Sequence, residues 1–440
     1  MLAPLELFSC PNCRAALFSA PGALECRSCS QTYAELGGVW CLVPHPDFWR
    51  TLWLSRVADF RELVQRHIAR LNAKLAEHAL LAATERRLVS LRQGLLAQAE
   101  AITTHLAPLG LPPTGPLRSA FAAAGHLPVV KCYENLFRDW SWGAAEAREA
   151  LELVQAMAPA ELGTCAVYGA GASRLAVDVH TSLRPQRTIA LDINPFPLLV
   201  AARLTRGDEV TLPEFPVGPD SAQNVVVTQT LRCPSLVDER FSFAFGDALR
   251  PPFAVESLDS VLTSWVIDAL DADFADTAAA IGNVLRLGGT WLNTGPLRFD
   301  RGLTEAYSIE EVQQIGKDAG FELVRTFQSC VDYFNSPHSG SRRRENVFCF
   351  ALRKVARAPA REPVSIHPAW LVDAKKPIPL TATTALLRKS SVLRHGVLSL
   401  VDGKRSLTDI AGALGEQWSM QPESLLDPLR VFFSNQGIAQ

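Results

Sequence analysis

One stretch, residues 164–194, limits the folds open to this 440-residue chain more than any other. It reads as a short apolar strand, then Gly169-Ala-Gly171, then an apolar helical segment, then a second apolar strand that ends in Asp192-Ile-Asn194. A strand, a glycine turn, a helix and a strand in this order predict a unit of an α/β sheet. Gly169 permits a sharp exit from the first strand, and Gly171 lets a ligand approach backbone N–H groups at the start of the helix.

The acid and the helix start predict what this unit binds. Asp192 follows Gly171 by 21 residues, which is where a carboxylate accepts hydrogen bonds from a ribose diol. Ser173 and Arg174 begin the helix, and Arg174 stands where the dinucleotide fingerprint has its third glycine. Together with Asn194 after the second strand, these residues are candidate cofactor contacts. The pattern predicts a nucleoside-binding unit, with an ordinary tight strand-to-helix turn as the alternative.

Composition narrows the classes of protein open to the chain. The sequence is 48% hydrophobic and carries a formal net charge of −2, values that are typical of a soluble globular protein and do not favour nucleic acid as a partner. The sequence has no apolar run of about 18 residues, the length that predicts a membrane span, and the N-terminus shows no signal-peptide pattern. We therefore expect a cytoplasmic protein of about two to four domains without a membrane partner.

Four of the ten cysteines form two pairs, Cys10-Pro-Asn-Cys13 and Cys26-Arg-Ser-Cys29. This spacing places four thiolates on two short knuckles, as a structural tetrahedral Zn²⁺ site requires. Two disulfides are the alternative, which the absence of a secretory signal disfavours. Residues 1–48 form too small a segment to fold on an apolar core alone, so we expect a zinc ribbon whose metal stabilises it.

The rest of the ribbon resembles a known family of small zinc proteins. Tyr33, Gly37-Gly38-Val39 and Leu42-Val43-Pro44 are similar to the tail of the Trm112-like ribbons. In other proteins these ribbons accompany methyltransferases, so the resemblance implies a structural rather than a catalytic metal.

Residues 51–160 are predicted to form a helical lid or scaffold. Up to about residue 110, apolar side chains recur at helical spacing, which predicts two long amphipathic helices. The loop at 111–116 is rich in proline and ends the pattern. The aromatic stretch 133–143 follows, immediately before the nucleoside-binding unit, and either packs in the core or folds over the ligand.

Two further strands end in residues that can reach a ligand. The strands span 241–245 and 258–264, within a core domain at 161–355. After the first come Gly246, Asp247 and Ala248, where an acid and a backbone amide can read an adenine edge; a simple turn is the alternative role of Asp247. After the second come Trp265 and Asp268, which we expect in the crevice at the carboxyl ends of the strands.

The last strands indicate the type of sheet. Gly288-Gly289 predicts a turn before a fifth strand, and strands at 321–327 and 346–352 are expected to form an antiparallel pair with a basic tip. Seven strands with such a closing pair describe the sheet of class I S-adenosylmethionine methyltransferases better than that of a dehydrogenase, because no second mononucleotide half is visible. Residues 207–240 are expected to be an irregular insertion.

The tail is predicted to be a separate small domain. Residues 356–366 are a linker by composition, and residues 367–440 contain two helices joined by a short turn, with Ser406 as N-cap. The segment 400–411 resembles the helical part of PqqD-like peptide-recognition domains and related winged helices. This resemblance implies a peptide or protein partner, with an inert scaffold and DNA binding as alternatives.

From Cys132 to Lys354 the order of motifs resembles the carnosine N-methyltransferase family, also called N2227-like. The matching pieces are Arg138-Asp139-Trp140-Ser141, Gly169-Ala-Gly171-x-x-Arg174-Leu-Ala, Gly246-Asp247, Ile267-Asp268 and Gly288-Gly289-Thr-Trp291-Leu-Asn293-Thr-Gly295-Pro296-Leu297. The resemblance implies a class I fold that uses S-adenosylmethionine. It implies a place beside the cofactor for Arg138 and for Asn135, which stands where the family has glutamine, and a grip on a substrate imidazole for Asp268.

The chain also departs from that family. After its acid the family has Thr-Ala-His-Asn, whereas this chain has Ala269-Leu270-Asp271-Ala272, so the substrate-side histidine is missing. Carnosine as the substrate therefore does not follow, although the cofactor does.

We thus expect methylation of an imidazole or amine nitrogen in a small molecule or peptide. Asp268 would accept the N–H of the acceptor and leave the opposite lone pair facing the methyl group. Trp265, Trp140 and Tyr133 would wall the sulfonium and the substrate, partly by cation–π contact. The alternatives are a protein side chain selected by the tail, RNA held by the ribbon and Arg342–Arg344, and an adaptor that binds S-adenosylmethionine without catalysis.

Overall fold

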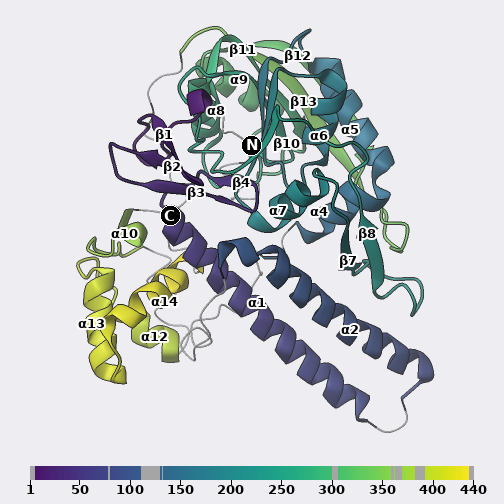
Figure 1. Ribbon diagram of the computed structural model, residues 1–440, viewed down its shortest axis with the longest axis vertical. Helices are drawn as coiled ribbons and strands as arrows, with labels where there is room; N and C mark the ends of the chain where they lie inside the picture. The colour runs from purple at the N-terminus through teal and green to yellow at the C-terminus, as the bar shows by residue number, and fades with distance from the viewer. Residues whose placement is uncertain are drawn as a thin grey trace. The chain divides into compact units, whose positions relative to one another are not determined.

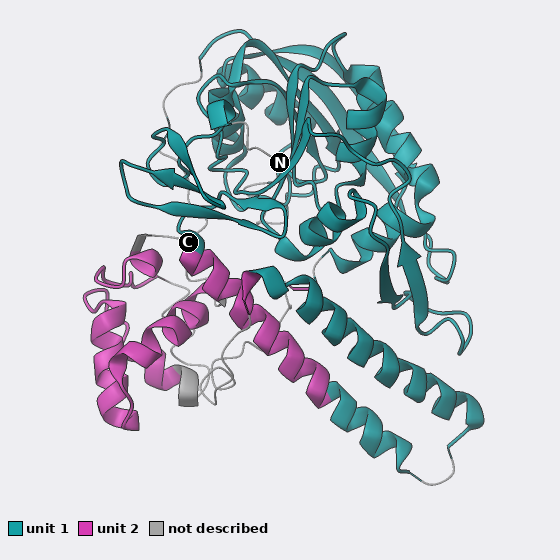
Figure 2. Ribbon diagram, viewed as in Figure 1, with its two compact units in different colours: residues 1–46, 67–108, 130–364 teal, residues 47–66, 109–129, 365–440 magenta. Residues whose placement is uncertain are grey.

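The computed structural model forms two compact units (Figure 2). The first holds residues 1–46, 67–108 and 130–364, and the second holds 47–66, 109–129 and 365–440. The residues described are 5–77, 80–110, 129–130, 132–299, 306–357, 361, 369–381 and 392–435. The proline-rich loop at 111–116 and much of the expected linker at 356–366 lie outside them.

One large sheet dominates the first unit (Figure 1). Its strands are β1 (Leu17–Ala20), β2 (Ala23–Cys26), β3 (Thr32–Leu36), β4 (Val39–Cys41), β5 (Thr164–Tyr168), β6 (Arg187–Asp192), β9 (Phe241–Phe245), β10 (Leu258–Ser264), β11 (Leu285–Gly295), β12 (Phe321–Asp332) and β13 (Arg344–Lys354). The order β9-β6-β5-β10-β11-β13-β12 contains the expected seven strands, and β13 runs antiparallel to both of its neighbours. This confirms the predicted fold class.

Most helices and short turns of the first unit lie beside these strands, whereas the long helix α2 (Ala82–His105) extends away from the sheet (Figure 1). The helices and turns are η1 (Leu5–Leu7), α2, η2 (Ala107–Leu109), α4 (Tyr133–Phe137), the π-helical turn η3 (Arg138–Trp142), α5 (Ala144–Met157), α6 (Arg174–Leu183), α7 (Pro195–Leu204), α8 (Phe274–Val284) and α9 (Ile309–Asp318). Ser308 caps α9 with the expected capping box to Glu311. β5 is buried along its whole length, as expected of a strand at the centre of a parallel sheet.

The zinc-ribbon segment is joined to this sheet. β4 runs parallel to β9, with Trp40 beside Ala244 and Cys41 beside Phe245. The N–H of Leu42 donates to the carbonyl of Phe245 at 2.9 Å. The ribbon therefore covers the edge that β9 would otherwise expose. Local sequence patterns do not predict this pairing.

Two expectations about the strands need correction. Gly288 and Gly289 lie inside β11, where the register with β10 shifts, so they form an irregularity within the strand rather than a turn before it. The insertion at 207–240 is more regular than predicted, because β7 (Val210–Glu214) and β8 (Val227–Leu231) pair as an antiparallel sheet of their own.

Both predicted long helices are present. The first, α1 (Pro46–Leu75), begins five residues before the predicted 51, and the second is α2. Proline in the first turn of α1 is compatible with a helix start. In the described residues, no helix combines the length and the apolar character needed to cross a membrane.

His105 is a buried histidine at the end of α2. Its side chain is buried, its Nδ1 accepts from the guanidinium of Arg203 at 3.4 Å, and its ring lies edge-on to Phe196. Burial, with a contribution from Arg203, lowers the pKa of His105 to about 4.

We expect this histidine to make stability pH-dependent. A histidine in the unfolded chain has a pKa of about 6.5. Between this pH and about 4, the unfolded chain therefore binds a proton at His105 and the folded chain does not. The free energy of unfolding should fall by up to about 3 kcal/mol as the pH drops from about 6.5 to 4. Urea unfolding across this range should show the drop, and His105→Gln should flatten it. The same slope in His105→Gln and in the exposed control His67→Gln would contradict this role.

The second unit contains part of α1 and the C-terminal helices. These are α10 (Ala369–Val372), α12 (Val392–Leu398), α13 (Leu407–Trp418) and α14 (Pro422–Asn435). Ser406 caps α13 as predicted, in a capping box with Asp409. Leu371, Leu414 and Phe433 are among the side chains of its apolar core.

Candidate functional site

The candidate site lies at the carboxyl ends of β5, β6 and β10, where the strand order reverses. Ligands of open α/β sheets bind at such a switch point. Asp192 ends β6, and its Oδ2 accepts from the N–H of Gly171 at 2.7 Å while its Oδ1 accepts from the N–H of Asn194 at 2.8 Å. The predicted acid therefore holds the predicted glycine turn directly.

Both glycines of the turn adopt left-handed backbone conformations, with φ of +62° at Gly169 and +52° at Gly171. A Cβ atom at Gly169 would lie 2.6 Å from the side chain of Val266. At Gly171 it would lie 3.5 Å from Nδ2 of Asn135, which places the Asn135 amide beside the turn. The first glycine is required by packing, whereas the second keeps space open in front of Asn135.

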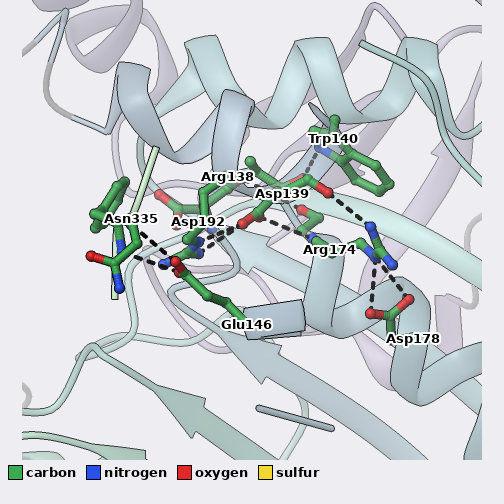
Figure 3. A network of polar contacts seen from close by, with 12 residues as sticks. Arg138, Asp139, Trp140, Glu146, Arg174, Asp178, Asp192 and Asn335 are labelled. Atoms are coloured by element: carbon green, nitrogen blue, oxygen red, sulfur yellow. Dashed lines mark hydrogen bonds and ion pairs between the residues drawn. The ribbon is translucent and has the colours of Figure 1, made fainter. Parts of the chain in front are cut away.

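The start of α6 is tied to the turn η3 (Figure 3). The Arg174 N–H donates to Oδ2 of Asp139 at 3.3 Å, and its guanidinium donates to the Asp139 carbonyl at 2.9 Å and to Asp178 at 2.9 Å. Ser173, just before it, is buried with φ of +68°. Arg174 therefore braces two segments of the site through neighbouring protein groups.

The indole of Trp140, in η3, is fixed to the glycine turn. Its Nε1 donates to the carbonyl of Ala172 at 2.8 Å, and only 4% of the side chain is exposed. Tyr133, in α4, is equally buried, and its hydroxyl donates to the carbonyl of Pro213 at 3.0 Å. Both rings are thus packed and hydrogen-bonded to protein backbone.

Arg138 carries the charge that faces the site from η3. Its Nε donates to Oδ1 of Asp139 at 2.8 Å, and its guanidinium lies over the rings of Tyr333 and Phe334, 5.3 and 4.9 Å from their centroids. Burial opposes the charge, but Asp139 outweighs it and raises the pKa of Arg138. Arg138 is therefore always a cation here, and π-helical turns such as η3 are frequent at functional sites.

The residues expected to read adenine lie at the end of β9. Asp247 is buried, and its Oδ1 accepts from the N–H of Leu249 at 2.9 Å, so it does form a turn. Ala248 between them is partly buried against the core. Asn194, at the end of the β6 segment, caps α7 by accepting from the N–H of Phe196 at 3.2 Å.

Trp265, directly after β10, is held in an unusual conformation. Its φ is +51°, a value that is an outlier for a bulky residue and is found at functional sites. Its ring stacks on Tyr333 at 5.0 Å with an interplanar angle of 2°. In the described part of the chain its buried Nε1 has no hydrogen-bond partner. The Nε1–H of Trp265 is therefore available to donate to a ligand.

A narrow cavity of about 60 Å³ lies among these groups. Its lining includes Arg138, Glu146, Arg174, Ser264, Trp265 and Tyr333. The predicted residues Arg138, Arg174 and Trp265 are thus brought to one cavity. Asp268 does not line it; its Oδ2 accepts from the N–H of Arg298 at 3.0 Å.

Glu146 is a site residue that the sequence pattern did not indicate. Its carboxylate accepts from the N–H groups of Phe334 and Asn335 at 3.1 and 3.0 Å (Figure 3). It thereby holds the segment after β12, including Tyr333, against the start of α5. An acid in the first turn of a helix is too common to have been singled out.

The four predicted metal ligands meet in the ribbon. The sulfurs of Cys10, Cys13, Cys26 and Cys29 all lie within 4.8 Å of one another, with separations of 3.5 Å for Cys10 and Cys29 and 3.4 Å for Cys13 and Cys26. Disulfides are excluded, since they require about 2.0 Å. A tetrahedral zinc with bonds of about 2.3 Å separates its sulfurs by about 3.8 Å. The cluster can therefore hold a structural zinc ion.

Comparisons with known proteins support no family assignment. No protein-family model and no curated protein matches the chain.

Solved structures show a weak likeness over about half of the chain. A chain of the complex between the Haloferax volcanii Trm112 methyltransferase activator and a candidate methyltransferase is 16% identical over 52% of this chain and 96% of its own, with a TM-score of 0.34. Phosphoethanolamine N-methyltransferase 2 of Haemonchus contortus with S-adenosyl-L-methionine is 15% identical over 55% and 61%, with a TM-score of 0.34. A candidate methyltransferase of Bacillus halodurans is 13% identical over 48% and 100%, also with a TM-score of 0.34. The fold is established instead by the strand order of this chain.

Proposed function

We propose that this protein is an S-adenosylmethionine-dependent methyltransferase. The observation that carries the proposal is the bond between Asp192 and the glycine turn at the switch point of a seven-stranded sheet. An acid at this place accepts from a ribose diol, and the antiparallel strand β13 stands where a dinucleotide enzyme would need a parallel strand of its second half.

The residues present fit this cofactor. Asp192 keeps further lone pairs for the ribose hydroxyls, because each carboxylate oxygen can accept twice. We assign Asp247 and the backbone of Ala248 to the adenine edge. At the other end, Asn135 stands beside the glycine turn and Arg138 lines the cavity next to its partner Asp139, and we assign this amide and this cation to the amino-acid carboxylate. When bound, the cofactor supplies a methyl group on a cationic sulfur.

We further propose that the acceptor is an imidazole or amine nitrogen. In methyl transfer the protein mainly aligns a neutral nucleophile about 3 to 3.5 Å from the methyl carbon and excludes water. The stacked pair of Trp265 and Tyr333 offers a flat surface for a planar ring. Asp268 lies outside the cavity lining, where it accepts from the backbone of Arg298, so we assign it to an N–H on the part of the acceptor that extends beyond this cavity. Little acid or base chemistry is needed because the nucleophile is already neutral.

We also propose roles for the ribbon and for the helical tail. The ribbon, residues 1–48, acts as a built-in companion of the catalytic domain, residues 161–355, because β4 extends its sheet. The Haloferax volcanii complex named above pairs a methyltransferase with a separate activator. The helical tail, residues 367–440, would recognise a peptide or protein.

One experiment tests the reaction and the acceptor together. Protein incubated with methyl-labelled S-adenosylmethionine and a fractionated cell extract should label a small imidazole or amine. Asp268→Asn should lower turnover about 100-fold with unchanged cofactor affinity, whereas the exposed neighbour Asp271→Asn should not. Label in polypeptide would make the tail a substrate reader instead. Cofactor binding without any label would identify a non-catalytic adaptor.

A further inference from the structure

A second cavity, of about 290 Å³, adjoins the site just described. It is lined by side chains from α4, η3, the β7 end and the loop after β12, among them Glu134, Phe137, Trp142, Glu214, Phe334 and Arg343. In three pairs of sequence neighbours, one residue lines each cavity: Phe137 and Arg138, Trp142 and Gly143, Tyr333 and Phe334. The two cavities are therefore lined by adjacent residues at three places in the chain.

Glu214 is the residue that gives this cavity its character. Its side chain is 4% exposed, and its carboxylate accepts from Trp142 Nε1 at 3.2 Å, Ser336 Oγ at 2.5 Å and Gln229 Nε2 at 2.8 Å. All three donors are neutral. The carboxylate is therefore held inside the protein by hydrogen bonds to neutral groups.

Within the described residues this buried charge has no ion-pair partner of the opposite sign. Arg343, the cation that lines the cavity, pairs with Glu345 and lies over the ring of Tyr333. A buried carboxylate without a counter-ion is costly. A ligand that carries a cationic group would supply the missing counter-ion of Glu214.

The remaining lining suits a cation as well. Glu134 adds a second carboxylate, whose pKa is raised by burial and by the negative charge of Glu214. Phe137, Trp142 and Phe334 add aromatic rings, whose faces attract ammonium and guanidinium groups. A phosphate or carboxylate would instead be repelled by both acids.

We propose that this cavity binds an ammonium or guanidinium group of the methyl-accepting molecule. The inference rests on the proposed function, since it assigns the cation to the acceptor. A protonated nitrogen has no lone pair to receive a methyl group, so the cation held by Glu214 is a second basic group. The substrate is therefore a compound with two basic nitrogens, one neutral beside Trp265 and one charged beside Glu214.

The test uses Trp142 as a reporter, because its indole N–H is bonded to Glu214. In full-length protein labelled with ¹⁵N-tryptophan, methylguanidinium or ethylammonium should shift the Trp142 indole signal saturably, and the neutral analogues acetamide and propanol should not. Trp142→Phe assigns the signal. Glu214→Gln, which keeps the shape and one acceptor, should weaken cation binding at least tenfold. The control Glu322→Gln, on exposed β12, should leave it unchanged.

Two further measurements keep the outcomes distinct. Thermal unfolding and cofactor binding of Glu214→Gln show that the variant is folded, and Glu134→Gln provides a second variant that should weaken cation binding about threefold. Methyl transfer to a dibasic acceptor should show a raised KM in Glu214→Gln with a smaller change in kcat.

If neither cation shifts the Trp142 signal, or if the shift survives Glu214→Gln, the inference is wrong even where methyl transfer occurs. Cation binding through Glu214 without any methyl transfer would retain the cavity's ligand class and overturn the proposed function alone.

Discussion

Asp192→Ala is expected to lower the affinity for S-adenosylmethionine about 100-fold, which corresponds to about 2.7 kcal/mol. The carboxylate accepts from the N–H groups of Gly171 and Asn194, and hydrogen bonds to a charged group each contribute about 1.5–3 kcal/mol. Its loss would release the glycine turn and also remove the acceptor for the ribose. Isothermal titration calorimetry of the purified variant measures the effect directly.

Two further variants separate cofactor binding from general damage. Asp192→Asn keeps one acceptor oxygen and should lose less affinity, while Asp208→Ala, an exposed acid paired with Arg203 on the surface, should lose none. Affinity that is equal in Asp192→Ala and wild type would remove the basis of the proposed cofactor site.

Removing zinc from the ribbon is expected to destabilise the whole first unit. Folding of small zinc domains depends on the metal, and here the ribbon shares one apolar core with the sheet, through contacts such as Phe8 on Phe253 and Phe253 on Tyr168. Losing it would expose that core and the β9 edge. We expect the apparent Tm to fall by about 10 °C, a loss of several kcal/mol.

The measurement is a thermal melt with a chelator, followed by readdition of zinc, on protein whose metal content is known. Cys26→Ser should reproduce the chelated melt, and Cys330→Ser, an exposed cysteine outside the cluster, should melt like wild type. If the chelated protein kept its Tm, zinc would not contribute to the stability of the fold.

Sequence patterns located the parts of the site that depend on local geometry. A glycine turn and the acid at the next strand end are set by backbone conformation within one βα unit, and Gly171 and Asp192 are indeed bonded. Trp265 is the first residue after a buried strand, so its place at the end of the sheet follows from local geometry, and it lines the cavity. Asp268, three residues further on, depends on a loop path that no pattern fixes, and it bonds to the backbone of Arg298 instead of lining the cavity.

The features that were missed depend on contacts between distant segments. Glu146 meets Phe334 and Asn335 across 188 or more residues, and Glu214 meets Ser336 across 122. Each acid is unremarkable in its own helix or strand. Only the fold brings it to its partners, so composition and periodicity carry no signal for it.

The pairing of β4 with β9 also has a consequence for dosage. When an activator is a separate protein, the fraction of enzyme whose sheet edge is covered follows the concentrations of both chains. Here the covering strand belongs to the same polypeptide, so it acts at a fixed local concentration. The ratio of ribbon to sheet is therefore one at every expression level, whatever the abundance of other proteins.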